Sequence, residues 1–210
     1  MRDRSGAWNS APLRCKSMGD LHPHSGLIVA IPEAEALVGR HRVALDINAR
    51  AGVPAHVTVL YPFLPTRDID TGVLERLGAL FGSVPAFEVA LTRTAWFGEH
   101  VLWLAPADPA PFVALTSLVH GAYPGYPPFA GLYADVVPHL TVGHGERLAE
   151  MIEAEGEVRE HLPIRSRVRE VLLLAQDEPE GDWRTLARFP LAPAVAPAGA
   201  VHASRTSVAP

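Results

Sequence analysis

Two short histidine motifs are the part of this sequence whose residue types and spacing suit chemistry. They are His56-Val57-Thr58-Val59 and His139-Leu140-Thr141-Val142, which lie 83 residues apart and are each approached by a Val-Pro pair. Imidazole has an ordinary pKa of about 6.5, so one histidine can accept a proton near neutral pH while another donates one. Such a pair suits acid–base catalysis, in which one group activates a nucleophile and the other protonates the leaving oxygen.

Each motif is predicted to form a β-strand that presents its polar residues on one face. Successive strand side chains point to opposite faces, so His56 and Thr58 share a face and lie about 7 Å apart along the strand. Val57 and Val59 point to the other face, where they can anchor the strand in a core, and the second motif repeats this pattern. One such motif alone is often an ordinary surface strand, so it is the repetition that favours catalysis.

The elements that would position the motifs alternate between strands and helices over residues 25–191. Apolar runs and alternating patterns predict strands at 27–31, 56–60, 87–94, 101–104, 139–142, 168–174 and 183–189. Helical spacing of apolar residues predicts helices at 33–49, 68–81, 109–121 and 146–155. A loop rich in Pro, Gly and Tyr over residues 123–131 either overhangs the site or is an ordinary connector.

A weak internal repeat is visible around the motifs. Residues 28–36 and 102–110 each read as a strand, a proline and a helix, and each is followed by a turn and a His-x-Thr-Val strand. This is what two copies of one lobe would look like. The alternative is a coincidence of two unrelated strand–helix units.

Composition favours one compact domain and excludes several classes of protein. Hydrophobic residues make up 48% and charged residues 20%, which allows a packed core. No apolar run approaches the ~20 residues of a transmembrane helix, and no signal peptide is recognisable. The single cysteine, Cys15, excludes an intramolecular disulfide and a cysteine-based zinc site, so we expect a cytoplasmic location. Residues 1–24 are predicted to be a disordered leader and residues 192–210 a disordered Ala/Pro tail.

The charged residues narrow the chemistry further. A net charge of −5 argues against a protein that coats nucleic acid nonspecifically. Lys16, the only lysine, lies in the predicted leader, so the folded part offers no lysine for a covalent intermediate. Arg93 is a candidate phosphate contact, but an arginine on an outward strand face is usually only solvated. His144 falls on the opposite strand face from His139, so we expect no metal site there.

The paired His-x-Thr-hydrophobic motifs resemble those of the 2H phosphoesterase superfamily, in particular its bacterial 2′-5′ RNA ligase-like branch. The resemblance covers about residues 25–191, and its motifs are specific for the superfamily but not for the substrate. It implies an α+β, bilobal fold: a pseudo-twofold pair of antiparallel sheets, flanked by helices, around a central cleft. It also implies that His56 and His139 are the catalytic pair and that Thr58 and Thr141 hydrogen-bond the phosphate oxygens.

Aromatic residues near the motifs are candidates for stacking on a nucleobase. Tyr61 is as suited to the cleft as to the core, and Trp96, at a predicted hairpin turn, is a candidate platform. Phe63 and Trp103 are predicted to be core residues. We favour His139 as the base and His56 as the acid, although the sequence does not decide between the two assignments.

The expected activity is that of a metal-independent enzyme without a cofactor. It would act on 2′,3′-cyclic phosphate or 2′-5′ phosphodiester bonds of RNA or nucleotides, or run in reverse as an ATP-independent ligase. We expect its partners to be RNA ends, oligonucleotides or small cyclic-phosphate nucleotides, with no membrane, and the protein to be a monomer. The alternatives are an RNA- or nucleotide-binding module without turnover, and a cyclic phosphodiesterase for a small ADP-ribose-type metabolite. The acidic net charge favours small substrates over long RNA.

Overall fold

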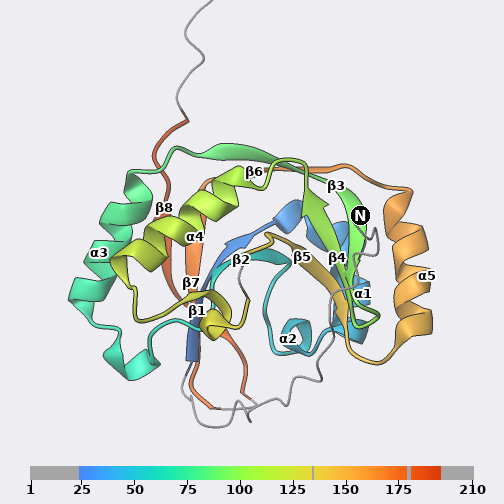
Figure 1. The fold of residues 1–210 in the computed structure, drawn as a ribbon, viewed down its shortest axis with the longest axis horizontal. Helices are drawn as coiled ribbons and strands as arrows, with labels where there is room; N and C mark the ends of the chain where they lie inside the picture. Colours follow the sequence, from blue (N-terminus) through green and yellow to red (C-terminus); the bar gives the residue numbers. More distant parts are fainter. Residues whose placement is uncertain (1–23, 134, 179–180, 195–210) are drawn as a thin grey trace, which may run out of the picture.

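The computed structural model describes residues 24–133, 135–178 and 181–194, which form two four-stranded antiparallel sheets with helices packed against them (Figure 1). The first sheet has the strand order β2 (His56–Leu60), β1 (His24–Ala30), β7 (Glu170–Gln176) and β8 (Arg184–Pro190). The second has the order β5 (Leu140–His144), β4 (Val101–Pro106), β3 (Phe87–Phe97) and β6 (Ile164–Val168). This architecture confirms the predicted α+β fold with a pair of antiparallel sheets.

The described helices fall between these strands in sequence. The α-helices are α1 (Pro32–Leu45), α2 (Ile47–Arg50), α3 (Thr71–Gly82), α4 (Ala110–Ala122) and α5 (Leu148–Arg159). Two 3-10 helices, η2 (Thr66–Asp68) and η3 (Pro128–Gly131), lie in the connections. In the described part of the chain, none of these helices has the length and apolar character needed to cross a membrane.

The predicted leader and tail fall largely on residues 1–23 and 195–210, which lie outside the described residues. Ala192, the first residue of the predicted tail, is hydrogen-bonded to the fold. Its N–H donates to the Val84 carbonyl and its carbonyl accepts from the Ala86 N–H, both at 2.8 Å.

The two sheets repeat one arrangement, and their helices cross between them. Each sheet begins with an edge strand at a histidine motif, beside a strand that leads into a helix, β1 or β4. Strand β2 begins with His56, and β5 begins one residue after His139. Helix α1 follows β1 of the first sheet but packs on β5 and β6 of the second. Helix α4 follows β4 of the second sheet but packs on β2 of the first. This symmetry favours the two-lobe interpretation of the internal repeat.

Local signals in the sequence explain where the helices begin and end. Helix α1 begins at Pro32, since the first turn of a helix needs no N–H donor at that position. The predicted helix 33–49 is instead two helices, because Asp46 is extended, with φ −130°, and its side chain accepts a hydrogen bond from the Asn48 N–H. Asp70 caps α3 in the same way, through the Val73 N–H at 2.8 Å.

The predicted strand 168–174 is also two strands, and this prediction was wrong in detail. Strand β6 ends at Val168 and pairs with β3, whereas β7 begins at Glu170 and pairs with β1 of the other sheet. The chain changes sheets at Arg169. Such a change depends on which strands are available as partners, and a local hydrophobic pattern does not contain that information.

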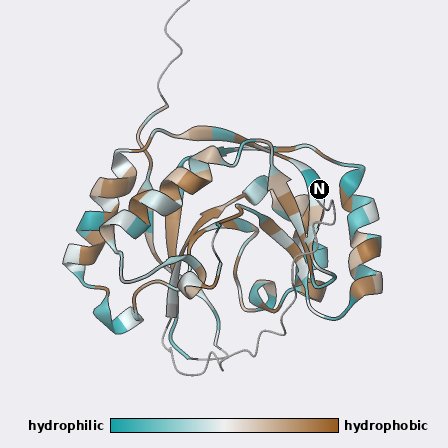
Figure 2. Ribbon diagram, in the orientation of Figure 1, coloured by the Kyte–Doolittle hydropathy of each residue, from teal (hydrophilic) through white to brown (hydrophobic). Residues whose placement is uncertain are grey.

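One continuous hydrophobic core joins both sheets to the helices. It contains Leu27 and Val57 from the first sheet together with Leu104 and Leu140 from the second. Apolar residues are concentrated along the central strands, whereas the outer helices mix apolar and polar residues (Figure 2). We call the side of each sheet that faces this core its helix face and the opposite side its open face.

Candidate active site

The two histidine motifs meet because the strands that carry them are neighbouring edges of the two sheets. Strands β2 and β5 are in contact and run side by side through the middle of the molecule (Figure 1). His56 and His139 are close enough for the charge of His139 to lower the pKa of His56. The structure thus brings together two motifs that are 83 residues apart in the chain.

Both histidines are held by the same backbone hydrogen bond. The Nδ1 atom of His56 lies 2.7 Å from the Pro54 carbonyl oxygen, and Nδ1 of His139 lies 2.7 Å from that of Val137. A carbonyl oxygen only accepts, so Nδ1 must donate and therefore carries the proton in each neutral ring. The Nε2 atom is then the ring atom of each histidine that can take a proton from a substrate or deliver one to it.

Each motif threonine shares a face with its histidine, as predicted. Ile28 of β1 pairs with Thr58, and Ala30 pairs with His56, which places both polar residues on the open face of the first sheet. Thr141 pairs with Trp103 on the open face of the second sheet. Both threonines are half-buried, and among the described residues neither hydroxyl has a hydrogen-bond partner. Both hydroxyls can therefore donate to a ligand.

Burial keeps both imidazoles largely uncharged. Burial is the main cause that lowers the pKa of His56 to about 4. The hydrogen bond to Pro54 and the negative charge of Asp46 raise this pKa, whereas the positive charges of Arg42 and His139 lower it. Burial also lowers the pKa of His139, against its hydrogen bond to Val137. Arg42 lowers the pKa of His56 but is not among the causes that shift the pKa of His139. The two histidines therefore differ in their electrostatic surroundings, although their Nδ1 hydrogen bonds are alike.

Helix α1 braces the segment that leads into the first motif. Arg42 is 2% exposed and donates from Nη1 to the Val53 carbonyl at 3.2 Å, while its Nη2 lies 3.1 Å from Asp46 Oδ2. The carboxylate of Glu35 accepts a hydrogen bond from the Ala55 N–H. A buried ion pair on a helix thus fixes the backbone immediately before His56, which the sequence pattern did not indicate.

Tyr61 directly follows β2, and its ring lies on the open face of the first sheet. Its ring packs over Gly26 of β1, where an added Cβ would come within 3.1 Å of Tyr61 Cδ2. The ring also makes an edge contact with Trp183, with centroids 6.0 Å apart, and burial raises the pKa of the phenol. Trp183 covers a small apolar cluster on this face, so it joins Tyr61 as an aromatic residue beside the first motif.

Phe63 is 4% exposed, which confirms the prediction that it belongs to the core. It packs against Tyr123 and Tyr126, with ring centroids 5.1 and 6.0 Å away. The Phe129 N–H donates to the Tyr61 carbonyl at 2.6 Å. The loop over residues 123–131 therefore supports the chain just after the first motif.

The structure does not bring Trp96 to the histidines. Trp96 pairs with Leu102 on the helix face, and its Nε1 donates to Glu155 of α5 at 3.0 Å. The reason is an irregularity in β3 between Leu91 and Arg93, which shifts the alternation of every later residue in the strand. A strict two-residue period, read from the sequence, does not reveal such a bulge.

Trp103 lies beside the second motif instead. It is 6% exposed, as expected of a buried residue, but it lies on the open face, with its ring centroid 5.7 Å from that of His139. Phe97 stacks on Trp103 at 4.7 Å and meets His139 edge-on at 5.0 Å. Two aromatic rings thus surround the His139 imidazole and contribute to its burial.

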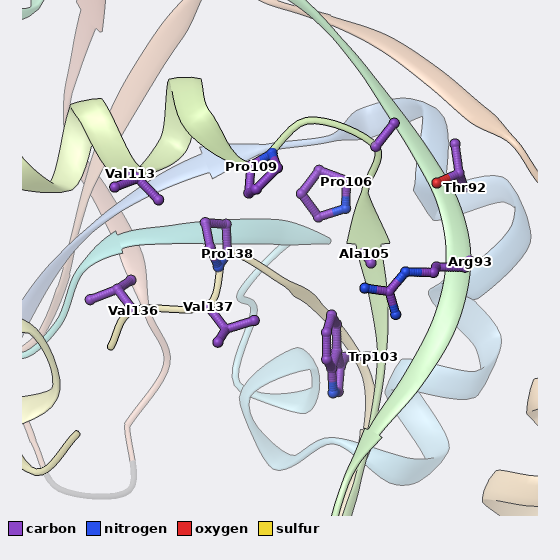
Figure 3. A pocket seen from close by; sticks show the side chains of 11 residues that line it. Thr92, Arg93, Trp103, Ala105, Pro106, Pro109, Val113, Val136, Val137 and Pro138 are labelled. Atoms are coloured by element: carbon purple, nitrogen blue, oxygen red, sulfur yellow. The ribbon is translucent and has the colours of Figure 1, made fainter. Parts of the chain in front are cut away.

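The same bulge turns the exposed Arg93 to the open face, and its role as a phosphate contact stays a prediction. Its guanidinium lies over the Trp103 ring, 5.8 Å from the centroid. Arg93 and Trp103 border a pocket of about 340 Å³ beside the approach to His139, which Val137 and Pro138 complete (Figure 3). Sequence reasoning missed this pocket because its lining comes from three separate segments of the chain.

The fold and the paired motifs define a class of two-sheet α+β proteins with a histidine motif on each inner edge strand. The chain matches the model of the 2′-5′ RNA ligase superfamily over residues 30–180. The chain belongs to this superfamily of 2H phosphoesterases.

Relatives and solved structures agree with this assignment. A Staphylococcus aureus (strain Newman) protein named as a phosphoesterase is 28% identical over 148 residues, which are 67% of this chain and 82% of the relative. Escherichia coli LigT, in complex with 3′-AMP, superposes with a TM-score of 0.51 and 18% identity, over 81% of this chain and 98% of LigT. The Thermus thermophilus protein TT0787 gives a TM-score of 0.55 at 17% identity, with 81% and 98% of the chains covered. At these identities the structural likeness shows a shared fold.

Proposed function

We propose that this protein is a metal-independent phosphoesterase that acts on 2′,3′-cyclic phosphate or 2′-5′ phosphodiester bonds of RNA or nucleotides. The observation that carries the proposal is the matched pair His56 and His139, held by the same Nδ1 hydrogen bond on two strands in contact. Two imidazoles with free Nε2 atoms on either side of a phosphate meet the need for one base and one acid. The superfamily assignment supports the same class of reaction.

The proposed reaction opens a cyclic phosphate with water. One neutral imidazole takes a proton from water at Nε2 as the water oxygen attacks phosphorus, and the protonated partner gives its Nε2 proton to the departing ribose oxygen. Thr58 and Thr141 donate hydrogen bonds to the phosphate oxygens that do not react. With a 5′-hydroxyl in place of water as the nucleophile, the same proton transfers open the cyclic phosphate and form a phosphodiester bond without ATP.

The structure changes our preferred assignment of the two roles. The base must be neutral, and His56 has its pKa lowered to about 4, with a contribution from Arg42 that His139 lacks. We therefore propose His56 as the base and His139 as the acid for hydrolysis, the reverse of the assignment favoured from the sequence. A bound phosphate is an anion, and it would stabilise the protonated form of His139.

The test is hydrolysis of nucleoside 2′,3′-cyclic monophosphates and 2′-5′ dinucleotides in the presence of EDTA. We expect turnover by the wild type and a loss of at least ~100-fold in kcat for His56→Ala and for His139→Ala. His161→Ala is the matched control, because His161 is exposed and its Nδ1 also faces a backbone carbonyl, that of Glu157. A wild type that binds these compounds but hydrolyses none would contradict the proposed activity and favour a binding module without turnover. Inactivation by EDTA would contradict metal independence.

A further inference from the structure

Arg93 is aligned with His139 across the open face of the second sheet. Leu104 pairs with Leu140, so the next open-face positions along these strands belong to Ala105 and His139. Ala105 in turn pairs with Arg93 on β3. Only the small side chain of Ala105 lies between the arginine and the histidine in this row, which leaves the surface there hollow.

The Arg93 guanidinium is held in place by aromatic packing and is not neutralised. It lies over the Trp103 ring, on which Phe97 also stacks. Within the described ranges, no carboxylate lies within ion-pair distance of Arg93, although most other arginines on the sheets have such a partner. An exposed, stacked guanidinium without a counter-ion is well suited to bind an anion bidentately.

The pocket beside Arg93 combines this positive charge with apolar walls. Its volume is about 340 Å³, and its walls include Pro106, Pro109, Val113 and Pro138 (Figure 3). Arg93 is the charged residue of this lining.

Arg93 is set back from the junction of the two sheets, where the reacting phosphate must lie. A phosphate that both His56 and His139 reach must lie over the contact between β2 and β5. Arg93 is on β3, on the other side of β5 and two strands away, which corresponds to ~10 Å between backbones. The guanidinium is therefore placed for a group that lies beyond the reacting phosphate.

We propose that the pocket formed by Arg93, Trp103 and Pro138 is a subsite for a second phosphate of the substrate. The preferred substrate then carries a 5′-phosphate on the nucleotide whose cyclic phosphate reacts, as an RNA 3′ end or a small 5′-phosphorylated nucleotide does. This inference rests on the proposed function, because it locates the reacting phosphate between the two histidines. Arg93 is a specificity-determining residue in this arrangement, whereas the proton transfers belong to the histidines.

Binding of two ligands that differ by one phosphate tests the subsite. The affinities of adenosine 3′-monophosphate and adenosine 3′,5′-bisphosphate are measured by titration calorimetry for the wild type, Arg93→Gln and Arg159→Gln. The wild type should prefer the bisphosphate, and Arg93→Gln should reduce that preference by ~10- to 100-fold, as expected for lost hydrogen bonds to a charged group. Arg159→Gln makes the same charge change on exposed α5, away from the pocket, and should keep the preference.

Three results would overturn the subsite. They are a wild type that does not prefer the bisphosphate, an Arg93→Gln variant that binds both ligands more weakly by the same factor, and an Arg93→Gln variant that binds both ligands as tightly as the wild type. Equal weakening would place Arg93 at the phosphate that the two ligands share. The binding assay does not depend on turnover, so a protein that prefers the bisphosphate but hydrolyses no cyclic phosphate would retain the subsite and lose the proposed function. A protein that hydrolyses 2′,3′-cyclic phosphates but has no preference for a 5′-phosphate would retain the proposed function and lose the subsite.

Discussion

At the scale of single residues, the protein restricts the tautomer, the ring orientation and the pKa of both imidazoles. The Nδ1 bonds to Pro54 and Val137 select one tautomer and one ring orientation for both histidines. Burial then lowers both pKa values, so the resting site is uncharged near neutral pH although each histidine can still be protonated. Two predictions about pH follow from these shifts.

The first prediction concerns the pH dependence of kcat/KM on a nucleoside 2′,3′-cyclic monophosphate. The proposed mechanism needs one neutral and one protonated imidazole, and this state is most populated midway between the two pKa values. Both lie below 6.5 in the free protein, so the bell-shaped profile should have its maximum below pH 6.5. At alkaline pH both rings are neutral, and kcat/KM should fall about tenfold per pH unit. A maximum at pH 7 or above would contradict the lowered pKa values.

The second prediction concerns stability in acid. The folded-state pKa of His56, about 4, is lower than its ordinary value of 6.5, so the unfolded chain binds a proton in this range that the folded protein does not. The free energy of unfolding should therefore decrease as the pH falls from 6.5 towards 4. His56→Gln removes this group, so urea unfolding at pH 7 and pH 5 should show a smaller loss for the variant. Equal losses in the two proteins would show that His56 does not titrate abnormally.

At the scale of elements, helix α1 supports the first motif from behind. Arg42 ties the Val53 carbonyl to Asp46, and Glu35 holds the Ala55 N–H, so the helix fixes the turn that enters β2. The loop over residues 123–131 supports the other end of β2 through the hydrogen bond between Phe129 and Tyr61. Strand β2 is short, and its position is set by the elements at its two ends.

We predict that Arg42→Met lowers the free energy of unfolding by about 3–5 kcal/mol, because it leaves Asp46 buried without its partner. It should also raise the pKa of His56, since the nearby positive charge is removed. The pKa is measured from the imidazole proton resonances by NMR titration. Arg42→Lys keeps the charge, and the double variant Arg42→Met with Asp46→Leu avoids the unpaired carboxylate. A His56 pKa that is the same in all of these proteins would exclude the electrostatic role of Arg42.

At the scale of the whole molecule, the two lobes are not independent folding units. The shared core runs from Leu27 and Val57 to Leu104 and Leu140, and α1 and α4 each pack on the sheet of the other half. The contact between β2 and β5, on which the site depends, is part of the same packing. We therefore expect the sheets to unfold together and the site to be lost with either one.

Leu104→Ala tests this cooperativity. Leu104 is 0% exposed, and its truncation should lower the free energy of unfolding by about 2–5 kcal/mol while leaving a single transition. Tryptophan fluorescence and far-UV circular dichroism should follow one denaturation curve. Val113→Ala, at an exposed position on α4, is the control and should change stability little. Separate transitions by the two probes would show that the lobes unfold independently.

The sequence by itself determined the parts of this protein that depend on local patterns. The period-two alternation around His56 and Thr58 was enough to place them on one strand face, and β2 has the predicted bounds. The apolar and helical spacings located most strands and helices, and the repeated motif indicated the superfamily that the family match then established. These features survive in a single sequence because each is encoded within a few neighbouring residues.

Only the tertiary structure decided what depends on partners distant in the chain. The bulge after Leu91 moved Arg93 to the open face and Trp96 to the helix face, and the chain changed sheets after Val168. The lowered pKa of His56 required Arg42 on a helix and the contact of two edge strands. Strand pairing, burial and electrostatic neighbours arise from packing between remote segments, and no periodicity within one segment records them.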